Sequence, residues 1–164
     1  MSKLIILSGV PGSGKSYFSN MIKMKNFNHV YIVSSDKLRN LITGNQQDLS
    51  CDQIMWKMFY ELPKIYSLDK ESIVIMDATA ISKKYRIDSN IEIKRYFDET
   101  SLVYFDIPKE IIDKQNTNRD FPLPQNIVDY YFQNIEYPDE KDAEFFDKIH
   151  VVNHNNFLEI VEKI

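Results

Sequence analysis

Residues 9–16, with the sequence GVPGSGKS, constrain the fold of this chain more than any other segment. They match the pattern G-x-x-x-x-G-K-[ST], whose backbone N–H groups surround the phosphates of a nucleoside triphosphate. The apolar residues 4–7 precede the motif and predict a buried parallel strand, and residues 16–25 contain neither Gly nor Pro and predict a helix. Strand, loop and helix are the arrangement that this motif requires, so the sequence predicts nucleotide binding here.

The residue types in this motif suit a phosphate group. Glycine at positions 9, 12 and 14 allows the backbone to adopt positive φ and to approach a phosphate closely. Successive N–H groups and the N-terminus of the helix attract the anion. Lys15 is expected to reach the β- and γ-phosphates, and the Ser16 hydroxyl is expected to bind Mg²⁺. The residues expected to hold ATP or another nucleoside triphosphate are Gly9, Pro11, Gly12, Ser13, Gly14, Lys15 and Ser16.

Apolar runs and helical segments alternate along the chain. Strands are predicted at 4–7, 29–33, 72–76, 102–106 and 149–152. Helices are predicted at 16–25, 50–68, 82–99, 108–118, 124–135 and 157–164, with a charged loop at 138–142. This alternation favours a three-layer α/β fold, with a central, mostly parallel sheet of about five strands and helices on both faces. The chain length predicts that residues 1–164 form one domain.

The helix predicted at 50–68 has two further features. Ser50 and Gln53 have the spacing of a capping box, so the helix is expected to begin there. Its apolar stripe is expected to face the core. The stripe consists of Ile54, Met58, Leu62, Ile65 and Tyr66.

Composition excludes several classes of protein. The single cysteine, Cys51, excludes an internal disulfide framework and is expected to be an inert thiol. The chain has no run of about 18 apolar residues and no signal-peptide pattern, so we expect no membrane partner and a cytoplasmic location, which is the host cytoplasm if a phage encodes the chain. The net charge of −4 does not favour nucleic acid as a partner. Lys83, Lys84 and Arg86 form either a solvated helix face or a local contact for a polynucleotide backbone.

Asp36 follows the second predicted strand, at the edge of the sheet where the 9–16 loop is also expected. Its carboxylate is predicted either to orient an acceptor hydroxyl and accept its proton, or to cap the next helix. Arg39 is spaced to face the same way, and it either binds a substrate phosphate through a bidentate contact or lies on the surface. This pair of residues favours a kinase over a nucleotide-binding switch.

Two further residues are candidates for contact with the phosphate donor. Asp77 ends a predicted strand, where it would orient a Mg²⁺-bound water, hold Arg39 in place or cap the following turn. Arg119 lies in a polar, proline-flanked segment that suits a lid near residues 115–125. An arginine there would neutralise charge on the β- and γ-phosphates during transfer, and the alternative is a solvated loop arginine.

Five segments, in the same order, resemble motifs of the kinase domain of bacteriophage polynucleotide 5′-hydroxyl kinase. They are residues 9–16, the SDKLR segment at 35–39, the hydrophobic strand and its Asp at 73–79, the FDIP segment at 105–108, and residues 118–124. The resemblance implies that the three-layer fold is of the P-loop kinase type. It also implies that Asp36 is the general base, that Arg39 binds the acceptor phosphate and that Arg119 contacts the donor phosphates. Asp120 stands where the phage enzyme has Gly, so the backbone of the lid is expected to differ.

The leading hypothesis is therefore an ATP-dependent kinase that phosphorylates the 5′-OH end of RNA or DNA. Its expected catalytic residues are Asp36, Lys15 and Arg119, with Arg39 and Asp77 as substrate-binding residues and Asp77 assisting Ser16 at Mg²⁺ through water. The same motifs occur in zeta-type toxins and small-molecule kinases, so a kinase for a metabolite or nucleotide sugar is the first alternative. An ATPase or switch module is the second. Repair partners would be separate enzymes, and the oligomeric state does not follow from the sequence.

Overall fold

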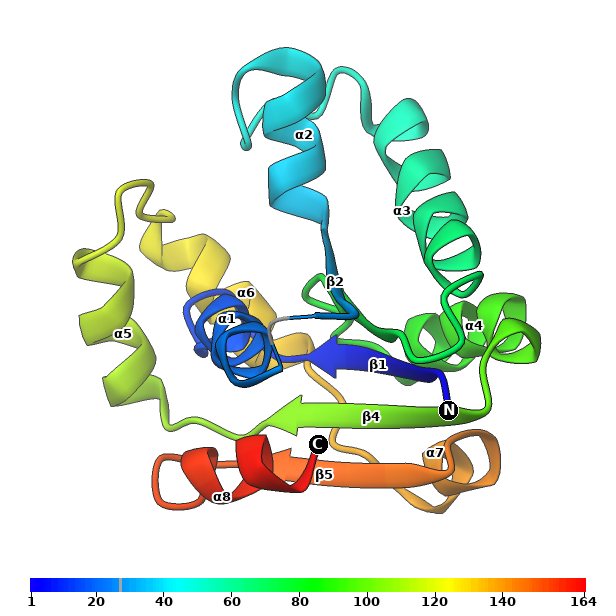
Figure 1. The fold of residues 1–164 in the computed structure, drawn as a ribbon. Coiled ribbons are helices and arrows are strands. Elements are labelled where there is room, and N and C mark those ends of the chain that lie inside the picture. The colour runs from blue at the N-terminus through cyan, green and yellow to red at the C-terminus, as the bar shows by residue number, and fades with distance from the viewer. Residues whose placement is uncertain (27) are drawn as a thin grey trace.

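In the computed structural model, which describes residues 1–26 and 28–164, five parallel strands form one sheet (Figure 1). The strand order is β2-β3-β1-β4-β5, so β1 (Lys3–Ser8) lies in the centre. Its apolar residues 4–7 are fully buried, as expected for a strand covered on both faces. The predicted parallel sheet is confirmed. The other strands are β2 (Val30–Ser34), β3 (Ile73–Asp77), β4 (Glu99–Phe105) and β5 (Lys148–Val152).

Helices cover both faces of the sheet because successive side chains of β1 point to opposite sides. Leu4 and Ile6 pack in one cluster with α3 and α4, and Ile5 and Leu7 pack in another with α1 and α8. A third cluster joins Val10 to α5 and α6. The helices are α1 (Lys15–Lys25), α2 (Ser35–Thr43), α3 (Asp52–Tyr66), α4 (Lys83–Ile93), the 3₁₀ turn η1 (Lys94–Tyr96), α5 (Lys109–Thr117), α6 (Gln125–Asn134), α7 (Glu140–Phe145) and α8 (Phe157–Lys163). Within the described residues, none of these helices is long and apolar enough to cross a membrane.

The boundary between α4 and β4 differs from the prediction. Ser82 caps α4 as expected, but the helix ends at Ile93 and not near Glu99, where β4 already begins. The polar residues Thr100 and Ser101 concealed the start of this strand. Both are buried, and the Thr100 amide and hydroxyl donate to Asp147 Oδ2 at 2.7 and 3.1 Å, which compensates for their burial.

The segment predicted as a charged loop at 138–142 contains the start of a short helix, α7. Asp139 caps it through a capping box with Asp142, so the charged residues that suggested a loop stabilise a helix N-terminus instead.

The beginning of α3 was predicted wrongly, and its buried face was predicted correctly only in part. Cys51 is the N-cap and makes no side-chain cap bond, so the predicted capping box of Ser50 and Gln53 does not form. Ser50 belongs to the preceding turn, where its N–H donates to Asp48 Oδ1 at 2.8 Å. The fully buried residues of α3 are Met55, Phe59 and Pro63. Met58, Leu62 and Tyr66 of the predicted stripe are half-buried and pack against the core, as expected. Ile54 and Ile65 are 55% and 56% exposed, so the most buried face lies one position along the helix from that stripe.

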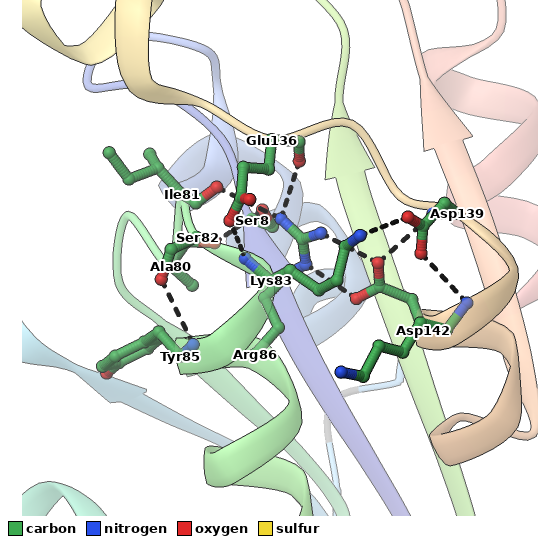
Figure 2. A network of polar contacts seen from close by, with 11 residues as sticks. Ser8, Ala80, Ile81, Ser82, Lys83, Tyr85, Arg86, Glu136, Asp139 and Asp142 are labelled. Atoms are coloured by element: carbon green, nitrogen blue, oxygen red, sulfur yellow. Dashed lines mark hydrogen bonds and ion pairs between the residues drawn. The ribbon is translucent and has the colours of Figure 1, made fainter.

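A buried ion pair connects α4 to α7 (Figure 2). The Arg86 guanidinium and the Asp142 carboxylate are both 0% exposed and form two parallel hydrogen bonds of 3.0 and 2.9 Å. Arg86 Nη1 also donates to the carbonyl oxygens of Ile81 and Glu136, at 3.2 and 2.8 Å. The buried charges are therefore paired, which is the condition under which such burial is tolerated.

This network corrects the interpretation of the basic cluster on α4. Arg86 is inaccessible to a polynucleotide backbone. Lys83 pairs with Asp139, and Lys84 pairs with Asp88 on its own helix. The cluster is thus mainly an internal ion-pair system, with Lys84 as its exposed member.

Candidate active site

A cavity of about 1060 Å³ lies at the carboxyl edge of the sheet, where the parallel strands end. The 9–16 loop, the end of β3, the starts of α2 and α3, and the lid segment all contribute to its wall. Every site residue predicted from the sequence lines it, except Gly9. The volume is at the upper end of the range of about 300–1,000 Å³ for ligand pockets, so the cavity has room for two substrates.

The loop conformation depends on glycine for two different reasons. Gly12 and Gly14 have φ of 83° and 92°, in the left-handed region that the sequence predicted. Gly9 is not in that region, contrary to the prediction. A Cβ at Gly9 would lie 2.8 Å from Ser13 Oγ and 2.9 Å from Phe105 Cβ, so close packing excludes a side chain there. The Gly9 N–H donates to Thr79 O at 2.9 Å and anchors the loop beside the end of β3.

Lys15 is buried at the first turn of α1. Its ammonium donates to the carbonyl oxygens of Gly9 and Val10, both at 2.9 Å, so the loop itself holds the cation. Burial lowers the pKa of Lys15 to about 8, although the charges of Asp77 and Asp36 oppose this shift. An anion bound in the loop would remove much of this cost.

Ser16 and Asp77 lie side by side at the cavity wall. The Ser16 hydroxyl donates to Asp77 Oδ2 at 2.7 Å. Burial raises the pKa of Asp77, while Lys15 and the hydrogen bond from Ser16 lower it. A hydroxyl next to a carboxylate is an oxygen donor set of the kind that Mg²⁺ prefers, so these residues fit that ion. Asp77 does not hold Arg39, one of the roles that the sequence left open, because Arg39 pairs with other carboxylates.

Asp36 occupies the first turn of α2 with its side chain 51% exposed. Ser34 is the N-cap, and its hydroxyl accepts the Lys37 N–H at 3.4 Å. The structure therefore removes the alternative that Asp36 is present as a helix cap. Its Oδ1 instead accepts a hydrogen bond of 3.3 Å from Arg39 Nη1.

Arg39 connects α2 to α3. Its Nε and Nη2 atoms donate to Oδ1 and Oδ2 of Asp52 at 2.7 and 3.3 Å, and the pKa of Arg39 is raised mainly by this contact. The guanidinium carbon lies 5.8 Å from the ring centroid of Trp56, within the range of a cation–π contact. Sequence reasoning missed both Asp52 and Trp56, because their contact with Arg39 depends on the angle between two helices and not on spacing along one of them.

Arg119 lies in the predicted lid, immediately after Asn118, the C-cap of α5. Its Nη1 atom is buried and has no hydrogen-bond partner within the described structure, and the residue lines the cavity. A buried guanidinium nitrogen without a partner is costly. An anion in the cavity would supply the missing acceptor at Nη1, whereas the residue as a whole is half-buried.

The loop between α5 and α6 is held by Asn116, which sequence reasoning also missed. Asn116 is buried, its side-chain amide donates to Leu123 O at 2.8 Å, and its Oδ1 accepts the Leu123 N–H at 2.9 Å. These two bonds close the loop that carries Arg119.

Replacing Asn116 by alanine should increase amide hydrogen exchange across residues 118–124 by about tenfold or more, because both Leu123 bonds are lost, each worth about 1 kcal/mol. Exchange followed by mass spectrometry measures this effect. Asn118→Ala, at an exposed position of the same loop, is the matched control. Equal exchange in the two variants would show that Asn116 does not hold the loop.

A parallel sheet with this loop at the carboxyl end of β1 defines a P-loop nucleotide-binding domain of the kinase-like type. The chain belongs to the family described as chromatin associated protein KTI12, whose model matches residues 1–145. The predicted P-loop kinase fold is confirmed. The family itself is KTI12 and not the phage polynucleotide kinase family that the motifs resemble.

Curated relatives cover most of this chain. Over 146 residues it is 23% identical to Protein kti12 of Schizosaccharomyces pombe, which covers 82% of this chain and 52% of that protein. Over 150 residues it is 27% identical to the L-seryl-tRNA(Sec) kinase of Methanococcus maripaludis, and the match covers 85% of this chain and 55% of that protein. The chain therefore spans about half the length of the curated relatives it matches. That residues 1–164 form one domain stays a prediction.

Two solved structures share the fold. Kti12 of Chaetomium thermophilum in complex with ADP-AlF₃ has a TM-score of 0.74 at 15% identity, covering 98% of this chain and 96% of that one. A fungal RNA kinase has a TM-score of 0.69 at 16% identity, covering 99% of this chain and 42% of that one. These identities carry the fold only. They show that the same architecture holds a nucleotide in one relative and belongs to an RNA kinase in another.

Proposed function

We propose that this chain transfers the terminal phosphoryl group of ATP to a hydroxyl group carried by RNA or DNA, with a 5′-OH end as the principal acceptor. The observation that carries the proposal is the position of Asp36. Its carboxylate lines the same cavity as the phosphate-binding loop, stays half-exposed and is held by Arg39. A carboxylate in this setting suits an acceptor hydroxyl, and a simple nucleotide switch has no need of one.

The donor half of the site would bind ATP in the 9–16 loop. Lys15 would exchange its carbonyl partners for phosphate oxygens, which removes the cost of its burial. Arg119 Nη1 would gain a phosphate oxygen as the partner it lacks among the described residues. Ser16, with Asp77 acting directly or through water, would hold Mg²⁺. When bound, Mg²⁺ neutralises charge that develops on the phosphates.

The acceptor half would be formed by α2 and the start of α3. Asp36 would accept a hydrogen bond from the acceptor hydroxyl and orient its oxygen towards the terminal phosphorus. It would take the proton as the new P–O bond forms and the bond from that phosphorus to the departing ADP oxygen breaks. Two relatives support a nucleic acid acceptor, because one is named as a kinase for a tRNA-borne seryl group and another as an RNA kinase.

The test is transfer of labelled phosphate from ATP to four acceptors: a 5′-OH RNA oligonucleotide, the matching DNA, seryl-tRNA and a panel of sugars and nucleosides. We expect label on the RNA or DNA ends, and none when the end is already phosphorylated. Lys15→Ala is the control for donor binding. Label on the metabolite panel alone would support a small-molecule kinase. ATP hydrolysis without any labelled acceptor would support an ATPase or switch module.

Nucleotide binding should depend on pH through Lys15. Because its pKa in the free protein is about 8 and bound phosphate favours the charged form, ADP binding near pH 9 should take up a proton, and affinity should fall as pH rises above about 8. The phosphate groups titrate near about pH 6 and do not contribute in this range. Calorimetry in buffers of different ionisation heat measures the uptake. Lys84→Ala, at an exposed lysine, should leave it unchanged, and an absence of uptake in the unaltered protein would contradict the prediction.

A further inference from the structure

The Arg39 guanidinium donates from each of its three nitrogens to one of two carboxylates. Asp52 takes Nε and Nη2 in a forked contact, and Asp36 takes Nη1. The face of Trp56 lies alongside. A guanidinium held at three nitrogens and stacked on an aromatic ring has one orientation, so Asp52 fixes the position of Arg39, and Arg39 in turn fixes the Asp36 carboxylate.

This arrangement affects which acceptors the site favours. Two carboxylates and one guanidinium leave an excess of negative charge beside the acceptor position. Asp52 also lines the cavity, and its side chain is 29% exposed. To contact Arg39, a phosphate group on the acceptor would have to displace Asp52 or approach Arg39 against the repulsion of the two carboxylates.

We infer that Asp52 is a positioning and specificity-determining residue, which commits Arg39 to orienting Asp36 and weakens binding of an acceptor phosphate at Arg39. The inference rests on the proposed function for the identity of Asp36 as base. It changes the role of Arg39 that the motif resemblance implies. Arg39 orients the base first, and it contacts an acceptor phosphate only in competition with Asp52.

Trp56 is the single tryptophan of the chain and lies beside Arg39, so its fluorescence reports binding on the acceptor side without any turnover. With the donor loop saturated by ADP, adenosine and adenosine 3′-monophosphate are titrated into the unaltered protein and into Asp52→Asn. The quantity compared is the ratio of the Kd for adenosine to the Kd for adenosine 3′-monophosphate. This ratio should be about tenfold larger in Asp52→Asn than in the unaltered protein, because Arg39 is released. Asp52→Glu keeps the charge and should restore the original ratio.

The matched control is Glu61→Gln, which removes a carboxylate of α3 that pairs with Lys64 and does not line the cavity. It should leave the ratio unchanged. If Asp52→Asn does not fold, Asp52→Ser takes its place, since a hydroxyl suits the start of α3. A ratio that stays constant within about twofold in the neutral variants overturns the inference, whatever the transfer assay gives.

Kinetics supply the second measurement. With a 5′-OH oligonucleotide as acceptor, Asp52→Asn should lower KM for the oligonucleotide, because the acceptor phosphate gains Arg39, and should lower kcat about tenfold, because Asp36 loses its orientation. If Asp52 had a purely structural role, Asp52→Asn would lower stability but would not tighten oligonucleotide binding while slowing turnover. If the unaltered protein transfers no phosphate while the fluorescence ratio shifts, the proposed function fails and the role of Asp52 at Arg39 stands.

Discussion

Asp36→Ala is expected to lower phosphoryl transfer by at least about 100-fold and to leave ATP binding unchanged, which is the pattern for loss of a general base. The side chain is half-exposed, and Ser34 caps α2 in its place, so the fold does not depend on Asp36. Its favourable position in the first helical turn is worth less than about 1 kcal/mol. The loss of activity would therefore exceed any loss of stability.

The measurement pairs transfer kinetics with calorimetric binding of a non-hydrolysable ATP analogue. Asp88→Ala is the matched control, because Asp88 is also a partly exposed helical aspartate with one basic partner, and it does not line the cavity. Thermal unfolding of both variants should agree within a few degrees. Near-normal turnover in Asp36→Ala would mean that Asp36 only helps to hold Arg39, and the acceptor half of the proposed function would have to be abandoned.

The donor loop and the central sheet could be predicted from the sequence because both depend on local chemistry. A buried strand needs a run of apolar residues such as 4–7, and a phosphate loop needs glycine at fixed spacing. Gly9 illustrates the limit. The motif shows that position 9 is a glycine. The reason why a side chain does not fit there is the proximity of Phe105, which lies far along the chain.

The partners of the charged residues could not be predicted, because they come from different elements. Arg39 was expected to meet a substrate phosphate or to lie on the surface, and Asp52 holds it from the next helix. Arg86 was expected to face solvent or a polynucleotide, and it is buried against Asp142. In each case the sequence gives the charge of a residue, whereas the packing angle between helices decides which opposite charge it meets.

Polar residues inside regular elements account for the errors in helix and strand boundaries. Thr100 and Ser101 belong to β4 because Asp147 satisfies Thr100 from the chain segment before β5. The charged residues around Asp139 belong to a helix because they satisfy its N-terminal N–H groups. A rule that assigns polar segments to loops fails where a hydrogen-bond partner is supplied by tertiary structure or by a cap.

Arg86→Ala is expected to destabilise the protein by about 3–5 kcal/mol. The change leaves the Asp142 carboxylate buried without its partner and removes the donor from the carbonyl oxygens of Ile81 and Glu136. Urea unfolding measures the difference. Lys84→Ala removes an exposed cation from the same helix and should cost less than about 0.5 kcal/mol.

Replacing both partners separates the penalty of an unpaired charge from the value of the pair. The double variant Arg86→Met, Asp142→Leu buries no charge, so it should recover most of the lost stability. A double variant as unstable as Arg86→Ala would show instead that the bonds to the two carbonyl groups, together with the capping-box bond from the Asp139 N–H to Asp142, dominate.

Arg86→Ala should also affect the conformation of the phosphate loop. Arg86 holds Ile81 O beside Ala80, which has φ of 44°, and Ser8 Oγ donates to Ala80 O at 2.8 Å (Figure 2). One residue earlier, Thr79 O accepts the Gly9 N–H that anchors the loop. An L residue in this backbone region is strained, so the turn relaxes when its bonds are lost. Arg86→Ala should therefore weaken ADP binding under conditions where the variant is still folded. The double variant Arg86→Met, Asp142→Leu also lacks the bond to Ile81 O. It should therefore recover stability without recovering ADP affinity. Full recovery of both would show that Arg86 acts on the loop through stability alone.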